Sequence, residues 1–277
     1  MAKIMITGSS GFIGGHLWRE LKNRGHELIG VDLKDGKDIN DVIAEELDGV
    51  DYVFHLAAKA KVPYSIENPI ETHITNVSGT LNMLEQSRIA GVKKFIYSAS
   101  SSAYGDQDRL PLDESMLPNP MSPYGVQKLV GEYYCRVYFD VYGIQTVSLR
   151  YFNVYGEDMP SDNAYSAAIA IFQQKKRDGL PLPVLGGKQT RDFTYVGDVV
   201  RANILAMESD TTLVGQIVNI GGGKNYSIDE IASAISDKIE HLPQRKGEPM
   251  DAIADISFAK YLWGWEPTQD VIEWLKK

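Results

Sequence analysis

Short apolar runs alternate with longer amphipathic stretches through the first half of the 277-residue chain. The short runs are rich in Ile, Val, Phe and Tyr and almost continuously apolar, which is typical of parallel strands buried on both faces. The longer stretches have the apolar spacing of helices, and a glycine lies just after each of them. The pattern predicts strands over Lys3–Thr7, Glu27–Asp32, Asp51–His55, Lys94–Ser98 and Gln145–Arg150, and helices over Phe12–Asn23, Pro69–Ala90 and Ser122–Tyr142.

The order of these elements predicts an α/β fold with a doubly wound, Rossmann-like parallel sheet, because strand–helix–strand crossovers place helices on both faces. We expect residues 1–156 to form this Rossmann-like domain, with 190–208 returning to it. Residues 157–189 and 209–277 are expected to form a smaller C-terminal substrate-binding lobe. Ligands in such folds bind at the carboxyl ends of the strands, so the site is expected between the two parts. The later helical patterns, separated by Pro- and Gly-rich connections, cover Ala164–Arg177, Asp198–Glu208, Asp229–Glu240 and Gln269–Lys276.

Composition narrows the class of partner. Lys and Arg number 28 against 37 Asp and Glu, which gives a net charge of −9. The absence of a basic stripe argues against nucleic acid and anionic membranes, since both require clustered cations. No apolar run reaches transmembrane length, and no secretory signal pattern opens the chain. The single cysteine, Cys135, excludes an internal disulfide, and the five histidines lack metal-ligand spacing. We expect a cytoplasmic protein with a small-molecule ligand and no metal.

The segment Thr7–Gly14 reads Thr-Gly-Ser-Ser-Gly-Phe-Ile-Gly and connects the first predicted strand to the first predicted helix. Glycines at this spacing allow a tight turn and a close approach of backbone N–H groups to a pyrophosphate. Asp32 ends the second predicted strand, where a carboxylate accepts hydrogen bonds from an adenosine ribose and repels a 2′-phosphate. The alternatives are a glycine-rich turn without a ligand and a strand-ending turn residue. Together the two features favour a dinucleotide site, with NAD preferred over NADP.

Tyr124 and Lys128 lie four residues apart and therefore on one face of a predicted helix. A nearby ammonium favours the phenolate, so Lys128 is expected to lower the pKa of Tyr124, as the oxidation of an alcohol requires. The alternative is a surface contact between the two side chains. The position of the pair favours chemistry, because it follows the fourth predicted strand and the serine-rich segment Ser98–Ser102. Hydroxyl groups there are expected to face the nicotinamide and to share a proton with Tyr124.

Taken together, the motifs make the chain resemble an extended short-chain dehydrogenase/reductase of the NAD-dependent nucleotide-sugar epimerase/dehydratase family. Within that family it is most similar to the UDP-hexose 4-epimerases. The motifs follow the family's order nearly from end to end, which makes an accidental similarity implausible. They are Thr7–Gly14, Asp38-Ile39, His55-Leu56-Ala57-Ala58, Asn76 with Gly79-Thr80, Tyr97–Gly105, Ser122-Pro123-Tyr124 to Lys128, Leu149–Asn153, Arg191-Asp192-Phe193 and Arg245–Glu248.

The resemblance implies a catalytic triad of Ser100, Tyr124 and Lys128. It also implies a homodimer, formed through a four-helix interface of residues 69–90 and 122–142. The implied cofactor-binding residues are Gly8, Ser10, Gly11, Phe12, Ile13, Gly14, Asp32, Asp38, Ile39, Leu56, Ala57, Ala58, Lys59, Asn76, Ser98, Tyr124, Lys128 and Phe152. The implied substrate-binding residues are Ser100, Ser101, Ser102, Tyr124, Asn153, Arg191 and Arg245, with both arginines on the substrate diphosphate. The alternatives are an ion pair of Arg191 with Asp192 or Asp198, and a solvated loop around Arg245.

The implied reaction is NAD-dependent 4-epimerisation of a UDP-sugar (UDP-glucose/galactose or UDP-GlcNAc/GalNAc) through a transient 4-keto intermediate. Dehydratases of the family usually place Asp-Glu directly after the catalytic Ser or Thr, and decarboxylases of UDP-glucuronate place Glu at the second position. Ser101 and Ser102 occupy these positions here. Asn153, where glucuronate epimerases tend to have Thr, favours a neutral sugar, and a small Ala252 near the sugar leaves room for an N-acetyl group. The alternatives are a nucleotide-sugar dehydratase or another sugar-modifying member and, disfavoured by the intact triad, a non-catalytic NAD-binding regulator.

Overall fold

A computed structural model describes residues 1–161, 167–243 and 249–277 of the chain. Its centre is a six-stranded sheet in which all neighbouring strands are parallel. This confirms the predicted α/β fold with a parallel Rossmann-like sheet. In spatial order the strands are β10 (Val214–Ile220), β5 (Gln145–Tyr151), β4 (Lys94–Ser100), β3 (Tyr52–His55), β1 (Lys3–Thr7) and β2 (Glu27–Val31).

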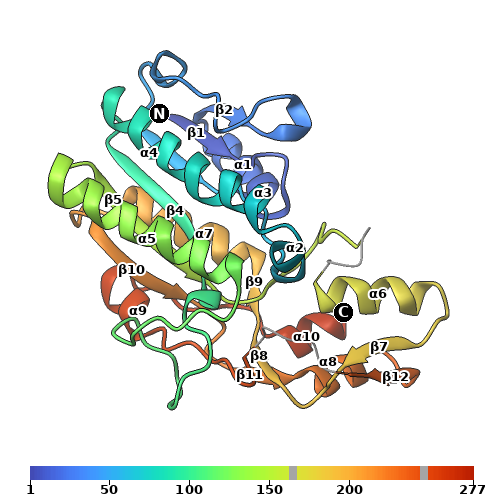
Figure 1. The fold of residues 1–277 in the computed structure, drawn as a ribbon. Helices are drawn as coiled ribbons and strands as arrows, with labels where there is room; N and C mark the ends of the chain where they lie inside the picture. Colours follow the sequence, from blue (N-terminus) through green and yellow to red (C-terminus); the bar gives the residue numbers. More distant parts are fainter. Residues whose placement is uncertain (162–166, 244–248) are drawn as a thin grey trace.

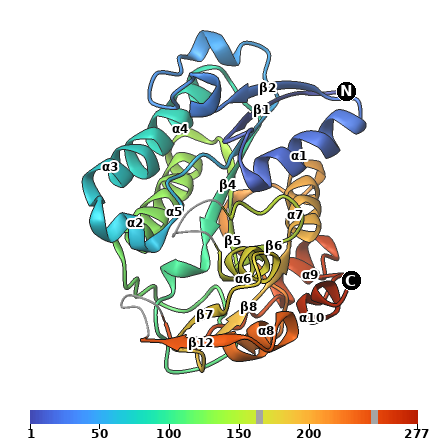
Figure 2. The same ribbon diagram turned by 90° about the vertical axis from the view of Figure 1, so that its right-hand side faces the viewer.

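Helices cover both faces of the sheet, as Figures 1 and 2 show. Helices α1 (Phe12–Asn23), α7 (Val196–Glu208) and α9 (Ser257–Trp263) pack on one face, and α4 (Thr80–Ile89) and α5 (Pro123–Tyr142) pack on the other. Strand β1 shows the alternation that this requires, because Ile4 and Ile6 enter the core under α1 and α7 while Met5 enters the core under α4 and α5. All three side chains are fully buried.

The predicted helix over residues 69–90 is three pieces. It consists of α3 (Pro69–His73), a π-helical turn η3 (Ile74–Gly79) and α4, and α2 (Val62–Glu67) precedes it. Gly79 permits the close approach of this region to the loop after β2, because a Cβ on it would lie 2.4 Å from Cδ1 of Ile39. Single π-turns inside helices are frequent at functional sites.

Strand β10 corrects the predicted boundary of the smaller lobe. Residues 209–277 were assigned to that lobe, yet β10 pairs with β5 as the sixth strand of the main sheet. The chain crosses to it through α7, and α9 then packs against it. The sequence does not indicate this strand, because Gly215, Gln216 and Asn219 interrupt its apolar run. β10 lies at the edge of the sheet and pairs only with β5.

The smaller lobe lies at the carboxyl end of the sheet (Figure 1). In it β7 (Leu182–Leu185) pairs with β12 (Ile239–Leu242), and α6 (Ala168–Arg177), α8 (Ile228–Ile235) and α10 (Val271–Leu275) share one apolar core with them. The predicted helix over 229–240 therefore ends at residue 235, and the predicted start of α6 at Ala164 lies outside the described residues. The described residues also form two short two-stranded sheets. In one, β8 (Thr190–Asp192) pairs with β11 (Asn225–Ser227), and in the other, β6 (Val154–Tyr155) pairs with β9 (Thr194–Tyr195).

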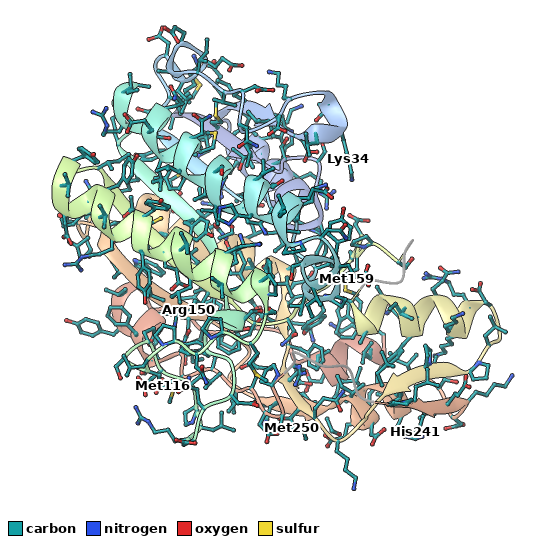
Figure 3. All side chains as sticks on the ribbon, in the orientation of Figure 1. Lys34, Met116, Arg150, Met159, His241 and Met250 are labelled. Carbon is teal, nitrogen blue, oxygen red and sulfur yellow. The ribbon has the colours of Figure 1, made fainter. Side chains whose placement is uncertain are left out.

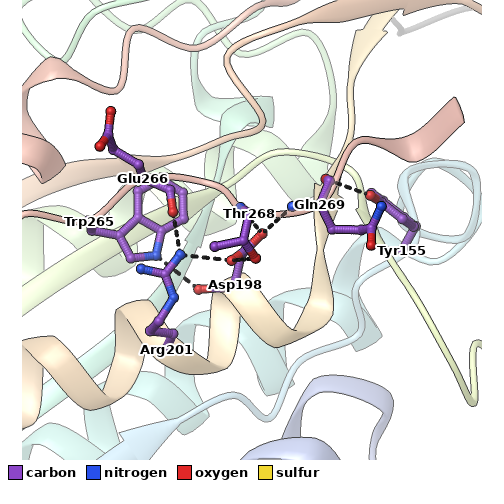
Figure 4. Close-up of polar contacts among 7 residues, drawn as sticks. All are labelled: Tyr155, Asp198, Arg201, Trp265, Glu266, Thr268 and Gln269. Carbon is purple, nitrogen blue, oxygen red and sulfur yellow. Dashed lines mark hydrogen bonds and ion pairs between the residues drawn. The ribbon is translucent and has the colours of Figure 1, made fainter. Parts of the chain in front are cut away.

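A buried carboxylate fixes the C-terminal segment to α7 (Figure 4). Asp198 accepts hydrogen bonds from the Thr268 backbone N–H and hydroxyl, both at 2.8 Å, and its backbone carbonyl accepts one from Trp265 Nε1 at 3.0 Å. Asp198 also forms an ion pair with Arg201. These bonds join the C-terminal segment to α7 of the Rossmann-like part, so they fix the position of the smaller lobe relative to the sheet.

Candidate active site

The glycine turn between β1 and α1 leaves no room for side chains at two of its positions. Gly8 has φ +69°, and a Cβ on it would lie 2.8 Å from the Ala57 backbone nitrogen. A Cβ on Gly14 would lie 2.0 Å from the Gly8 carbonyl oxygen. The N-cap of α1, Gly11, provides no side-chain cap for the N–H groups of the first turn. Free N–H groups and the positive end of the helix dipole favour a bound phosphate at this point.

Asp32 extends from the end of β2 to the same turn. Its Oδ2 accepts a hydrogen bond from the Ser10 N–H at 3.0 Å, and its Oδ1 accepts one from the Lys34 N–H at 2.9 Å. Lys34, labelled in Figure 3, donates from Nζ to the Ser10 carbonyl at 3.1 Å. The acidic residue and the glycine turn are thus joined as the sequence predicts. Each carboxylate oxygen keeps a second lone pair for a ligand hydroxyl.

A buried histidine connects this turn to the loop after β3. Thr80 donates its hydroxyl proton to the Asn76 carbonyl at 2.8 Å, so it accepts from His55 Nε2 at 2.9 Å. His55 Nδ1 therefore accepts from the Thr7 hydroxyl at 2.8 Å, and Thr7 Oγ1 accepts from the Ala57 N–H at 3.1 Å. Burial lowers the pKa of His55 to about 3, which keeps the ring neutral with its proton on Nε2. The chain fixes the Ala57 loop against the glycine turn.

Ser100, Tyr124 and Lys128 come together at the carboxyl end of β4. Tyr124 and Lys128 lie one turn apart on α5, both buried, and the Tyr124 phenol hydrogen bonds with the Ser100 side chain. Lys128 donates from Nζ to the Ser98 carbonyl at 2.8 Å and lies 4.9 Å from the centre of the Tyr97 ring. The backbone N–H of Tyr124 donates to Ser65 Oγ at 3.1 Å, which holds the start of α5. This is the grouping that the sequence predicts.

The electrostatics of Tyr124 differ from the prediction. Burial raises the pKa of Tyr124 to about 12, and the hydrogen bond with Ser100 opposes this only in part. The predicted lowering of this pKa is wrong for the chain alone, because burial of the phenol outweighs the hydrogen bond that favours the phenolate. Burial also lowers the pKa of Lys128 itself, to about 8.

A cleft of about 990 Å³ opens in front of these residues. Asn153 donates from Nδ2 to the Asp192 carbonyl at 2.9 Å, and Arg191 donates to the Thr190 carbonyl at 2.8 Å. Arg245, the second predicted diphosphate ligand, lies outside the described residues. Of the predicted site residues, those that line the cleft are Ile13, Ser100, Ser101, Ser102, Tyr124, Asn153 and Arg191, and Ala252 lines it as well.

The sequence match decides the family. Residues 4–221 match the family model "Epimerase", described as the NAD dependent epimerase/dehydratase family. The chain belongs to this family. A protein of Methanocaldococcus jannaschii named as a putative UDP-glucose 4-epimerase is 37% identical to it, over 99% of this chain and 96% of the relative.

Solved epimerase structures have the same fold with different sugars bound. The UDP-N-acetylglucosamine 4-epimerase from Methanobrevibacter ruminantium, in complex with UDP-N-acetylmuramic acid, has a TM-score of 0.93 at 32% identity. The UDP-glucose 4-epimerase from Thermotoga maritima, with UDP-glucose, has a TM-score of 0.92 at 35% identity. The UDP-glucuronic acid 4-epimerase from Bacillus cereus, with UDP-glucuronic acid and NAD, has a TM-score of 0.90 at 33% identity. Each comparison covers 99% of this chain and 96% of the other.

The residues of this epimerase/dehydratase family member fit the family's cofactor. A turn too crowded for Cβ atoms, an uncapped helix start and the Asp32 carboxylate are the features that a dinucleotide pyrophosphate and ribose require. Asn76 supports the adjoining loop: its Oδ1 accepts from the Lys59 N–H at 2.8 Å and its Nδ2 donates to the Lys59 carbonyl at 3.1 Å. Gln127 on α5, which sequence analysis missed, accepts from Asn76 Nδ2 at 2.8 Å.

The other predicted cofactor residues have mostly local roles. Asp38 accepts from the backbone and side chain of Asn40. Phe152 is fully buried against Tyr104, with ring centres 6.2 Å apart, so its side chain belongs to the core. Ser98 donates to the Tyr151 hydroxyl at 3.1 Å and offers its carbonyl to Lys128. Ile39 is buried in the core beside Gly79. The remaining three lie at the start of α1 or just after β3: Phe12, Leu56 and Ala58.

The described residues offer neither a metal site nor a membrane-spanning helix. No group of three or more His, Cys, Asp or Glu side chains there is arranged to hold a metal ion. Within the same residues, no helix combines the length and apolar character needed to cross a membrane.

Proposed function

We propose that the protein catalyses NAD-dependent 4-epimerisation of a UDP-sugar. The observation that carries the proposal is the buried Ser100–Tyr124 contact, with Lys128 one turn away, on the wall of a cleft large enough for a nucleotide sugar. The relatives named above support it, because their names specify 4-epimerases of three different UDP-sugars.

The chemistry assigned to the chain's own groups is proton transfer. NAD, when bound, supplies the acceptor for the C4 hydrogen of the sugar and a positive charge. Tyr124 takes the proton of the C4 hydroxyl, directly or through Ser100, and returns it after the 4-keto sugar has presented its other face. Lys128, charged below its pKa of about 8, stabilises the phenolate.

The serines after Ser100 support epimerisation over dehydration. Ser102 donates its backbone N–H to Ser100 Oγ at 3.2 Å, and Ser100 donates to Ser102 Oγ at 3.1 Å. Elimination of water needs an additional acid and base, and a serine hydroxyl cannot supply either at neutral pH. A 4-keto or unsaturated product would favour the dehydratase alternative.

The decisive experiment is a proton NMR time course of the purified protein with NAD and UDP-GlcNAc, repeated with UDP-glucose. The expected result is a new anomeric signal from the 4-epimer with at least one of the two sugars. Failure with both sugars, while NAD is bound, would contradict the neutral-sugar proposal, and UDP-glucuronate would then be tried.

Arg191 is proposed to bind the substrate diphosphate, together with Arg245. We expect Arg191→Met to raise KM for the UDP-sugar about tenfold or more with a smaller change in kcat, because a charge-assisted hydrogen bond contributes about 1.5–3 kcal/mol. Steady-state kinetics measures this. Lys176→Met is the control, since it removes a positive charge from α6 without reaching the cleft lining. Equal KM changes in both variants would show a general charge effect.

We also propose that the protein is a homodimer. The outer faces of α5 and of the α3–η3–α4 segment expose apolar side chains, and these helices pack side by side. Monomeric proteins rarely expose a patch of this kind, whereas helix pairs commonly associate through one. The exposed residues are Ile70, Ile74 and Ile89 on the first segment and Val126, Tyr133, Val137 and Val141 on α5.

Val137→Arg is expected to convert the dimer to a monomer, because it places a charge in the middle of the apolar stripe. Sedimentation velocity at about micromolar concentration measures the mass. Tyr261→Arg is the control, since Tyr261 is 83% exposed on α9, away from this face. A monomeric wild-type protein would contradict the proposed assembly.

A further inference from the structure

A buried ion pair lies one helical turn beyond Lys128. Arg150, on β5, donates from Nε and Nη2 to the two carboxylate oxygens of Glu132, on α5, at 2.8 and 2.6 Å. The Glu132 side chain is 0% exposed and that of Arg150 is 1% exposed. In Figure 3, Arg150 lies beside the lower half of α5, toward the loop that carries Met116. Burying two charges is costly even when they pair, so this pair is not explained by stability alone.

Arg150 also packs against Tyr104. Its guanidinium lies 4.3 Å from the centre of the Tyr104 ring. The Tyr104 hydroxyl donates to Asn219 Oδ1 at 2.8 Å, and Asn219 Nδ2 donates to the Leu112 carbonyl at 2.8 Å. Leu112 lines the cleft. Contacts therefore run from Leu112 through Asn219 and Tyr104 to Arg150. They hold Arg150 where it binds both carboxylate oxygens of Glu132.

Glu132 is four residues after Lys128 on one helix, so the two side chains lie on the same face. Burial lowers the pKa of Lys128, and the charge of Glu132 opposes this change. Burial raises the pKa of Glu132, and the charges of Arg150 and, to a smaller extent, Lys128 oppose that change. Because Arg150 engages both oxygens, Glu132 cannot turn and pair directly with Lys128. The ammonium thus remains on the Ser98 carbonyl, one helical turn from Tyr124.

The other titratable groups that face Lys128 supply no negative charge. Burial raises the pKa of Tyr124 and of Cys135, on α5, to about 12, and raises that of Tyr97, on β4, well above its usual value. Burial lowers the pKa of His55, on β3, to about 3. All four are neutral at pH 7, which leaves Glu132 as the anion among the described neighbours of Lys128.

We propose that Glu132, held in place by Arg150, is a positioning residue that keeps Lys128 protonated at the active site. The proposal rests on the proposed function, in which the charge of Lys128 stabilises the Tyr124 phenolate. It adds that Glu132 and Arg150 set the pH range in which the enzyme works.

The test is a direct titration of Lys128 in the NAD-loaded protein. Lysine is labelled with ¹³C at Cε, and the Lys128 signal is identified by its loss in Lys128→Arg. The main variant is Glu132→Gln with Arg150→Met, because removing both charges leaves no unpaired buried ion. The expected result is a fall of about one pH unit in the Lys128 midpoint, a tenfold change in the ratio of its two forms. The high-pH loss of kcat should move down with it.

Asp140→Asn is the matched control, because Asp140 lies on the same helix in an exposed pair with Arg136. In this variant the titration midpoint of Lys128 should equal the wild-type value. It should also be unchanged in Glu132→Asp, which keeps the negative charge. The proposal is overturned if the double variant titrates like the wild type, or if Glu132→Asp moves as far as the double variant. If no sugar turns over in any variant, the proposed function fails while the titration still decides the role of Glu132.

Discussion

Replacing Tyr124 by phenylalanine is expected to lower sugar turnover by about 10²- to 10⁴-fold, the usual contribution of a positioned proton-transfer group. The substitution removes only the phenolic oxygen, which hydrogen bonds with Ser100. The backbone bond from Tyr124 to Ser65 remains, so the start of α5 should stay in place. Bound NAD, measured by its release on denaturation, should be unchanged. The NMR time course with the preferred UDP-sugar measures turnover.

A matched control separates loss of the proton-transfer group from loss of a buried hydroxyl. Tyr138 lies on the same helix and donates from its hydroxyl to Glu85 at 3.1 Å, well away from the cleft lining. Tyr138→Phe should therefore keep wild-type turnover. Ser100→Ala should have a smaller effect than Tyr124→Phe if Tyr124 can take the proton directly. Turnover above a tenth of wild type in Tyr124→Phe would contradict the assigned role.

The parts of the site that could be predicted from sequence are those fixed by consecutive residues. The turn Thr7–Gly14 has its strand, its glycines and its helix start in one segment, so its geometry follows from local backbone restrictions. Asp32 could be placed beside it because parallel neighbouring strands end at the same edge of a sheet. Tyr124 and Lys128 could be placed on one helix face because they are four residues apart in the sequence.

The parts that could not be predicted depend on contacts between distant segments. Gln127 supports Asn76 across 51 positions, and Glu132 meets Arg150 across 18, with no spacing rule to indicate either. The pKa of Tyr124 depends on how fully the fold buries it, which a Tyr–Lys spacing does not reveal. Lys175, near the end of α6, lines the cleft because α6 packs against β7, which the helical pattern of its own segment does not indicate.

Gly14→Ala is expected to prevent NAD retention and to lower the stability of the fold. The new Cβ would lie 2.0 Å from the Gly8 carbonyl oxygen, 2.9 Å from the Gly8 carbonyl carbon and 3.1 Å from Ser9 Cα. All three are backbone atoms, so no flexible side chain can move aside, and the turn itself must shift. Overpacking of this kind costs about 1–3 kcal/mol or more. The NAD content of the purified protein and its thermal midpoint measure the two effects.

The neighbouring glycine provides the control for this prediction. Gly15 lies on the same helix, and the nearest atom to a Cβ on it would be the Ser9 carbonyl oxygen at 3.9 Å. Gly15→Ala should therefore keep NAD and raise the thermal midpoint, since alanine is better than glycine within a helix by up to about 1 kcal/mol. If both variants lose NAD equally, the loss comes from stiffening the start of α1 rather than from the contact with Gly8. If neither loses it, the turn tolerates a shift, and close packing of Gly14 on Gly8 is not what shapes the pyrophosphate site.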